Sequence, residues 1–322
     1  MGALLQTESL FSLGTLIISF FGRFRAVHEN DHGMALLRLF YNGLCAIGTG
    51  RRLQVQAEGY KTIPGPGGPL RLRLYRGCGG NALPAVIFFH GGAFCVGDLN
   101  SHDASARALA NAASCLVIVV DYRLAPEHTY PAAAADAYCA LQWVASNATD
   151  LGIDRQRLIV AGDSAGGALA AVVCRWARER GGAKIALQIL IYPMTDSSMG
   201  TASWQQFANG PGLNYGAMAA AWRRYAPNAH ERSSADVSPL AAGDLRGLPP
   251  ALVITAENDP LRDEGEAYAM ALRDNRVSVS LKRYPGATHG FFQIPHSQSG
   301  RKALADIARV LADRFESAPA AV

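Results

Sequence analysis

The sequence predicts an α/β fold in which a mostly parallel sheet carries helices on both faces. Short apolar runs typical of strands alternate with apolar-periodic helical stretches along most of the chain. With 322 residues, of which 49% are hydrophobic, the chain is also long enough to bury the large core that such a sheet requires. We therefore expect one α/β domain with an added subdomain.

The strands and helices can be assigned in order from these patterns. Strands are expected near residues 53–59, 70–76, 84–90, 115–121, 157–161, 185–191, 250–255 and 277–284. Helices are expected near residues 102–113, 131–146, 165–180, 261–274 and 299–314. No helical stretch separates the first two strands, and the proline- and glycine-rich residues 64–68 between them predict an antiparallel hairpin.

A glycine-rich turn between a predicted strand and a predicted helix carries a serine. The sequence Gly-Asp-Ser-Ala-Gly at 162–166 joins the strand-like run 158–161 to a buried helix that begins near 167. A serine in so tight a turn is lifted out of the sheet, where its hydroxyl can reach a substrate and a base. Ser164 is therefore the candidate nucleophile, although the pentapeptide alone also fits an ordinary glycine-rich turn.

Two further groups needed to activate a serine follow in the order Ser, Asp, His. Asp259 follows the strand predicted at 250–255, and His289 follows the strand predicted at 277–284. A serine hydroxyl is a weak nucleophile until an imidazole takes its proton, and a carboxylate orients that imidazole and stabilises its charged form. Each residue alone fits a loop histidine or a helix cap. Together they predict a catalytic triad at one edge of the sheet.

The loop after the strand predicted at 84–90 is a candidate for the site that binds the oxyanion. Its sequence is His-Gly-Gly-Ala-Phe at 90–94, and we interpret His90 as a group that orients the loop. Backbone N–H groups of such a loop, together with the N–H after the nucleophile, stabilise the negative oxygen of a tetrahedral intermediate. The expected members are Gly91, which shapes the loop, and the donors Gly92, Ala93 and Ala165.

These motifs resemble those of the hormone-sensitive-lipase-like carboxylesterases of bacteria, which have the α/β-hydrolase fold. The resemblance covers about residues 55–315 and rests on motifs at 90–94, 121–128 (Asp-Tyr-Arg-Leu-Ala-Pro-Glu-His), 162–167, 259–265 (Asp-Pro-Leu-Arg-Asp-Glu-Gly) and 289–291 (His-Gly-Phe). It implies Ser164 as nucleophile, Asp259 rather than Asp263 as acid, and His289 as base. The chain departs from the family at Ala93, where a third glycine is usual, and the added methyl is expected to narrow the pocket.

The resemblance also implies a cap over the active site. The cap is expected to consist of one or two helices in residues 1–50 and an aromatic-bearing insertion at 195–240. The catalytic domain would then span 51–194 and 241–316, followed by a loose tail at 317–322. Most aromatic side chains of the insertion should pack within the cap, whereas the side chains expected at the substrate pocket are Phe94, Tyr192, Phe207 and Phe291.

Charge and cysteine usage exclude some classes of protein. The 30 basic and 26 acidic residues give a net charge of +4 and form no basic block, which argues against a nucleic-acid-binding surface. We interpret the six cysteines, which lack paired spacing, as buried reduced thiols, and this favours the cytoplasm. Residues 10–21 are almost wholly apolar but too few to span a bilayer. We expect a cap helix there, with peripheral membrane contact as the alternative.

Two other classes of function have some support in the sequence. His-Glu-Asn-Asp-His at 28–32 matches a zinc motif in which His28 and His32 bind the metal, but its Asn and Asp favour a turn over a helix interior. A ligand receptor that has lost catalysis would be expected to lack a triad member, and all three are present. We therefore predict a serine carboxylesterase without metal or cofactor that hydrolyses small-molecule esters of short to medium acyl chain length. Amidase or lactonase activity remains an alternative, and a homodimer is left open.

Overall fold

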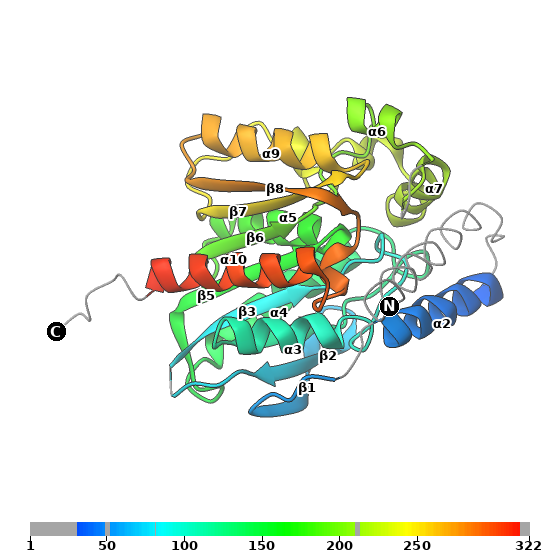
Figure 1. Cartoon of the computed structure of the whole chain (residues 1–322). Helices are drawn as coiled ribbons and strands as arrows, with labels where there is room; N and C mark the ends of the chain where they lie inside the picture. Colours follow the sequence, from blue (N-terminus) through cyan, green and yellow to red (C-terminus); the bar gives the residue numbers. More distant parts are fainter. Residues whose placement is uncertain (1–30, 49–51, 81, 210–212, 316–322) are drawn as a thin grey trace, which may run out of the picture.

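The computed structural model describes residues 31–48, 52–80, 82–209 and 213–315 (Figure 1). Three predictions fall on residues outside these ranges. They concern the apolar run 10–21, the zinc ligand His28 and the tail 317–322. They stay predictions.

The core of the molecule is an eight-stranded sheet with the strand order β1-β2-β4-β3-β5-β6-β7-β8. The strands are β1 (Ala57–Gly65), β2 (Gly68–Arg76), β3 (Leu83–Phe89), β4 (Leu116–Val120), β5 (Ile153–Asp163), β6 (Leu187–Ile191), β7 (Ala251–Asn258) and β8 (Val279–Thr288). The β1–β2 and β2–β4 pairs are antiparallel, and the pairs from β4 through β8 are parallel. The predicted mostly parallel sheet of eight strands is confirmed.

The first strand is the one whose predicted position is wrong. The expected range 53–59 is displaced, because β1 spans Ala57–Gly65 and pairs with β2 as far as Gly65 opposite Gly68. Pro64 argued against a strand at this position, since proline has no N–H to donate. β1 is an edge strand, however, so one of its sides has no neighbouring strand and tolerates a proline. The predicted hairpin is correct, and its turn is shorter than expected.

Helices cover both faces of the sheet, as predicted (Figure 1). One face carries α3 (Asp103–Ala112) and α10 (Gln298–Phe315), which contact each other and bury their apolar side chains in one core cluster. The other face carries α4 (Ala132–Ser146), α5 (Ala165–Glu179) and α9 (Arg262–Asp274), which contribute to a second cluster. The strands β3 and β4 are continuous apolar runs, and β6 is apolar except for Gln188, because both faces of these strands are covered.

The insertion between β6 and β7 is helical. It contains α6 (Ala202–Gln206), α7 (Tyr215–Tyr225), α8 (Ala229–Arg232) and the short 3₁₀ helix η2 (Pro239–Ala241). Three of its aromatic side chains, Trp204, Trp222 and Tyr225, are buried, whereas Tyr215 is exposed. A second 3₁₀ helix, η3 (Phe291–Gln293), follows β8.

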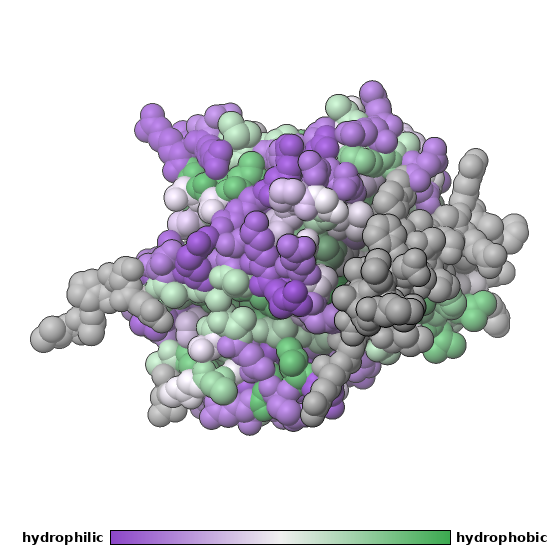
Figure 2. Space-filling view, in the orientation of Figure 1, coloured by the Kyte–Doolittle hydropathy of each residue, from purple (hydrophilic) through white to green (hydrophobic). Residues whose placement is uncertain are grey.

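The N-terminal helix α2 (Asp31–Gly48) has two different faces. Met34, Leu37 and Tyr41 are buried against the protein. Leu36 and Leu39 on the outer side are 68% and 72% exposed, and Figure 2 shows an apolar area over this helix. Within the described ranges, no helix combines the length and the apolar character that crossing a membrane requires.

The cysteines differ in part from the expectation. Cys45, Cys95, Cys115 and Cys174 are buried free thiols, as predicted. Cys78 is exposed and Cys139 is half-buried, so burial was wrongly assigned to these two. Cys78 lies in the turn that follows β2, where the chain leaves the sheet.

Candidate active site

Ser164, His289 and Asp259 meet at the carboxyl ends of three strands. The Ser164 Oγ lies 3.0 Å from Nε2 of His289, and Nδ1 of the same ring lies 2.8 Å from Oδ2 of Asp259. The Asp259 side chain is fully buried, whereas the ring of His289 is 9% exposed. An imidazole held between a hydroxyl and a buried carboxylate can take the hydroxyl proton as the hydroxyl attacks a carbonyl.

The backbone turns sharply at Ser164, as the sequence predicted. Ser164 follows β5 directly and precedes α5, with φ 55° and ψ −119°. A non-glycine residue rarely adopts such a φ unless its surroundings enforce it. Gly166 allows the turn to pack closely, because a Cβ at that position would collide with the carbonyl of Phe89 at the end of β3. The turn therefore presents the serine above the sheet edge.

The two neighbouring acids at the end of β7 occupy different surroundings. Asp259 uses Oδ2 for His289 and accepts the N–H of Leu261 on Oδ1, at 2.9 Å. Asp263 instead accepts the backbone N–H of Ser203 at 2.7 Å and pairs with Arg262. Burial raises the pKa of Asp263, but these partners outweigh burial and hold that pKa below its usual value. Asp263 thus ties α6 to α9 and does not contact the imidazole.

The glycine-rich loop after β3 presents backbone donors beside Ser164. The N–H of Gly91 is engaged, since it donates to Oδ1 of Asp163 at 2.8 Å. The N–H groups of Gly92, Ala93 and Ala165 donate to no acceptor in the described part of the chain. Gly91 therefore shapes the loop, and the other three N–H groups are available to an oxyanion. Ala93 has φ 52°, a conformation that favours glycine.

A buried polar network behind the nucleophile was not predicted from the sequence. Asp163 is fully buried, and its Oδ1 lies 3.1 Å from Nε2 of His102. Burial raises the pKa of Asp163, but His102 and the N–H of Gly91 outweigh burial and keep that pKa below its usual value. Asp163 therefore holds the glycine-rich loop as a buried acceptor. The motif contained Asp163, but the sequence did not indicate which loop would contact it.

His90 contacts the glycine-rich loop that we expected it to orient. Its ring stacks on Tyr122 at 4.3 Å between centroids, and its Nδ1 lies 2.8 Å from the carbonyl oxygen of Gly91. Burial, reinforced by His102, lowers the pKa of His90 to about 4. A ring that stays neutral at physiological pH can pack beside the oxyanion loop without placing a charge there.

The cavity at Ser164 is small, with a volume of about 50 Å³. Its lining comes from α2, the glycine-rich loop, the nucleophile turn, the insertion and the segment after β8. The lining residues are Tyr41, Leu44, Cys45, Gly92, Ala93, Ser164, Leu213, His289, Gly290 and Gln293. Both segments expected to form the cap contribute to this lining. Ala93 is one of the lining residues, and narrowing of the pocket by its methyl stays a prediction.

None of the four aromatic residues expected at the substrate pocket is among the lining residues. Phe94 is buried, has φ 61° and stacks on Tyr225 of α7 with 3.7 Å between the ring centroids. Tyr192 packs against the ring of His289 at 4.6 Å, and Phe291 packs edge-on against Tyr192. Phe207 lies under the guanidinium of Arg262. Tyr192 and Phe291 thus pack next to the triad without lining the cavity. Tyr41 and Leu44 of α2 line it.

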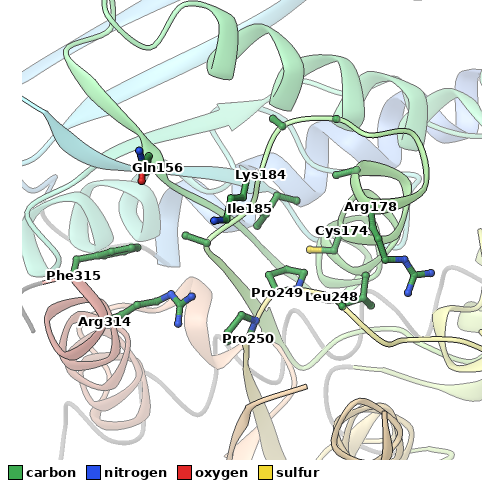
Figure 3. A pocket seen from close by; sticks show the side chains of 15 residues that line it. Gln156, Cys174, Arg178, Lys184, Ile185, Leu248, Pro249, Pro250, Arg314 and Phe315 are labelled. Carbon is green, nitrogen blue, oxygen red and sulfur yellow. The ribbon is translucent and has the colours of Figure 1, made fainter. Parts of the chain in front are cut away.

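A much larger cavity, of about 610 Å³, lies at the amino ends of β6 and β7 (Figure 3). Its lining includes Lys184, Arg314 and Phe315, and no member of the triad. No group of three or more His, Cys, Asp or Glu side chains within the described ranges is arranged to hold a metal ion.

The comparisons with known proteins agree with this geometry. A family model described as alpha/beta hydrolase fold matches residues 86–293. The chain belongs to the α/β-hydrolase fold family. The carboxylic ester hydrolase LipN of Mycobacterium tuberculosis is 41% identical over 270 residues, which cover 82% of this chain and 72% of LipN. An arylesterase of Saccharolobus solfataricus is 34% identical over 84% of this chain and 85% of that protein.

The structure is also similar to solved structures of esterases. A hyperthermophilic esterase from the archaeon Pyrobaculum calidifontis has 41% sequence identity and a TM-score of 0.85, covering 90% of this chain and 96% of that chain. The resemblance drawn from the motifs and the predicted α/β-hydrolase fold are both confirmed. The sequence missed Asp163 and the contribution of Tyr41 and Gln293, whose roles depend on contacts between distant segments.

Proposed function

We propose that this chain is a carboxylic ester hydrolase in which Ser164 forms an acyl-enzyme. The observation that carries the proposal is the pair of short contacts that join Ser164 to His289 and His289 to Asp259. The relatives named as carboxylic ester hydrolase, arylesterase and esterase support the same reaction class.

Each atom of the site has a place in the proposed reaction. The Ser164 Oγ attacks the ester carbonyl while Nε2 of His289 takes the hydroxyl proton, and Asp259 stabilises the imidazolium. The N–H groups of Gly92, Ala93 and Ala165 bind the negative oxygen. Each such donor is typically worth about 3 kcal/mol in the transition state. The proton of His289 then passes to the alcohol, which leaves. Water attacks the acyl-enzyme while His289 takes its proton, and the acid leaves as that proton returns to the Ser164 Oγ.

The cavity volume supports short acyl groups as substrates. The cavity of about 50 Å³ is small compared with the several hundred Å³ of a typical ligand site, and this favours short acyl groups. Longer chains require the lining to move. We propose an optimum at two to four acyl carbons, at the short end of the range expected from the sequence.

Amide and lactone hydrolysis stay as alternatives, because a triad does not by itself determine the leaving group. The free buried thiols support a cytoplasmic location. Whether the protein acts as a homodimer stays an open prediction.

The proposal is tested by measuring kcat/KM on p-nitrophenyl esters with two to twelve acyl carbons, and on matched anilides and lactones. We expect the highest value at two to four carbons, a steep decline beyond, and full activity after treatment with EDTA. Anilide or lactone turnover faster than ester turnover would favour the alternatives. Loss of activity with EDTA and recovery with zinc would contradict the metal-free mechanism and support the motif at 28–32.

A further inference from the structure

Gln293 occupies a position that the reaction itself does not require. It ends η3, four residues after His289, and it lines the cavity at Ser164. Its Nε2 lies 2.9 Å from the hydroxyl of Tyr41, 3.1 Å from Nε2 of His102 and 3.5 Å from Oδ2 of Asp163. The side chain therefore connects α2 to the network that holds the glycine-rich loop.

Tyr41 is equally well fixed on the α2 side. It is 4% exposed, and its hydroxyl, which accepts the Gln293 N–H, is also hydrogen-bonded to the thiol of Cys45 one turn further along α2. Both Tyr41 and Cys45 line the cavity. The Tyr41–Gln293 hydrogen bond therefore joins two side chains that each have further polar partners, on α2 and in the network behind Ser164.

Arg38 and Asn42 of α2 hydrogen-bond to segments other than the one that carries His289. Arg38 donates to the carbonyl oxygens of Cys95 and Ala125 at 2.8 and 2.9 Å, and it pairs with Glu127. Asn42 donates to Asp98 at 2.9 Å. These bonds hold α2 to the segments that follow β3 and β4. The Tyr41–Gln293 contact holds the same helix to the segment that carries His289.

We propose that this contact, the Tyr41–Gln293 bridge, determines the acyl-chain length that the enzyme accepts. By fixing α2 to the His289 segment, the bridge keeps the acyl cavity at about 50 Å³ and excludes long chains. Without it, α2 stays held by Arg38 and Asn42 and can tilt away from the His289 segment, which lengthens the cavity. The proposal rests on the proposed ester hydrolysis at Ser164.

The test compares variants that remove the bridge with matched variants elsewhere. Tyr41→Phe removes one hydroxyl, and Gln293→Met keeps the side-chain length without the amide. Tyr60→Phe on the edge strand β1 and Gln156→Met at the distant cavity are the matched controls. The measurement is the ratio of kcat/KM for the octanoate ester to that for the acetate ester, with the melting temperature of each variant.

We expect the octanoate-to-acetate ratio to rise about tenfold in each bridge variant, since one methylene at a pocket wall changes discrimination by 10-fold or more. The double variant should equal the single variants, because either change removes the same contact. Both controls should keep the wild-type ratio.

An unchanged ratio in a folded Tyr41→Phe variant would overturn the proposal, as would an equal loss on all chain lengths. If the Gln293→Met variant does not fold, the Tyr41→Phe variant alone tests the proposal. If the wild-type protein were no more active on esters than the Ser164→Ala variant, the proposed function itself would be refuted. Failure of the bridge proposal and failure of the proposed function are therefore distinguishable.

Discussion

The two cavities at opposite edges of the sheet differ in size and in chemistry. The cavity at the amino ends of β6 and β7 has a volume of about 610 Å³, compared with about 50 Å³ at the carboxyl ends. Volumes of several hundred Å³ are typical of ligand sites. Nevertheless, the small cavity contains the serine, the imidazole and the free N–H groups. In this protein, volume alone would indicate the wrong edge of the sheet.

Backbone strain distinguishes the two cavities better than volume does. At the catalytic site φ is 52° at Ala93, 55° at Ser164 and 34° at Tyr192. Ala82, Ser114 and Arg276 also have positive φ, but they precede β3, β4 and β8 at the other edge of the sheet. No non-glycine residue with positive φ lines the large cavity. Such conformations cost of order 1–3 kcal/mol each and persist only where the surroundings enforce them. At the catalytic cavity, the fold therefore stabilises an unfavourable backbone that positions reactive groups.

Removing the nucleophile should have the largest effect. Ser164→Ala should lower kcat by roughly 10⁵–10⁶-fold, because loss of the serine in a triad removes nearly all covalent catalysis. The melting temperature should change little. Lys184→Ala in the large cavity is the matched control and should keep wild-type kcat/KM. A large loss with Lys184→Ala, or a small one with Ser164→Ala, would reverse our comparison of the two cavities.

The next largest effect should separate the two acids at the end of β7. Asp259→Asn should lower kcat by about 10⁴-fold, since an amide favours the wrong imidazole tautomer. Asp263→Asn should cost less than about tenfold, because Asp263 contacts Ser203 and Arg262 and not the imidazole. Steady-state kinetics on an acetate ester measure both. If Asp263→Asn lowered kcat more than Asp259→Asn, our assignment of Asp259 as the carboxylate of the triad would be wrong.

The smallest effect concerns stability rather than turnover. Burial raises the pKa of Glu264 to about 8, and the carboxylate accepts N–H groups from Thr195 and Trp204 at 2.8 and 2.7 Å. Because the folded state binds this proton more tightly than the unfolded state, stability is greatest below the ordinary pKa. It should then fall as pH rises toward about 8, by at most about 1.4 kcal/mol per pH unit.

Glu264→Gln removes this titration while kcat should stay within about threefold of wild type. The variant should be less stable at low pH, because the amide NH₂ faces an N–H donor, at a cost of about 1–3 kcal/mol. Urea unfolding between pH 5 and pH 8 should show a flatter pH dependence than in the wild type. An identical slope in both proteins would show that Glu264 does not titrate in this range.

The sequence was informative about the catalytic edge because strand, turn and motif are local signals. Ser164, Asp259 and His289 each follow a strand of the parallel part of the sheet, so parallel pairing alone brings them to one edge. The position of β1 was predicted wrongly because Pro64 suggested a turn, whereas an edge strand tolerates a proline. The lining of the pocket was not predictable in the same way. Tyr41 and Gln293 are 252 positions apart, and neither belongs to a motif.

The central claim is that Ser164 is the activated nucleophile, and covalent labelling tests it most directly. An organophosphate such as diethyl p-nitrophenyl phosphate should react once per chain, as the Ser164 Oγ attacks phosphorus, nitrophenolate leaves and His289 takes the proton. Mass spectrometry with peptide mapping should place one diethylphosphoryl group on Ser164, in proportion to the activity lost, and none on the Ser164→Ala variant. Full loss of activity with the group on another residue, or full labelling of Ser164 with activity retained, would contradict the account.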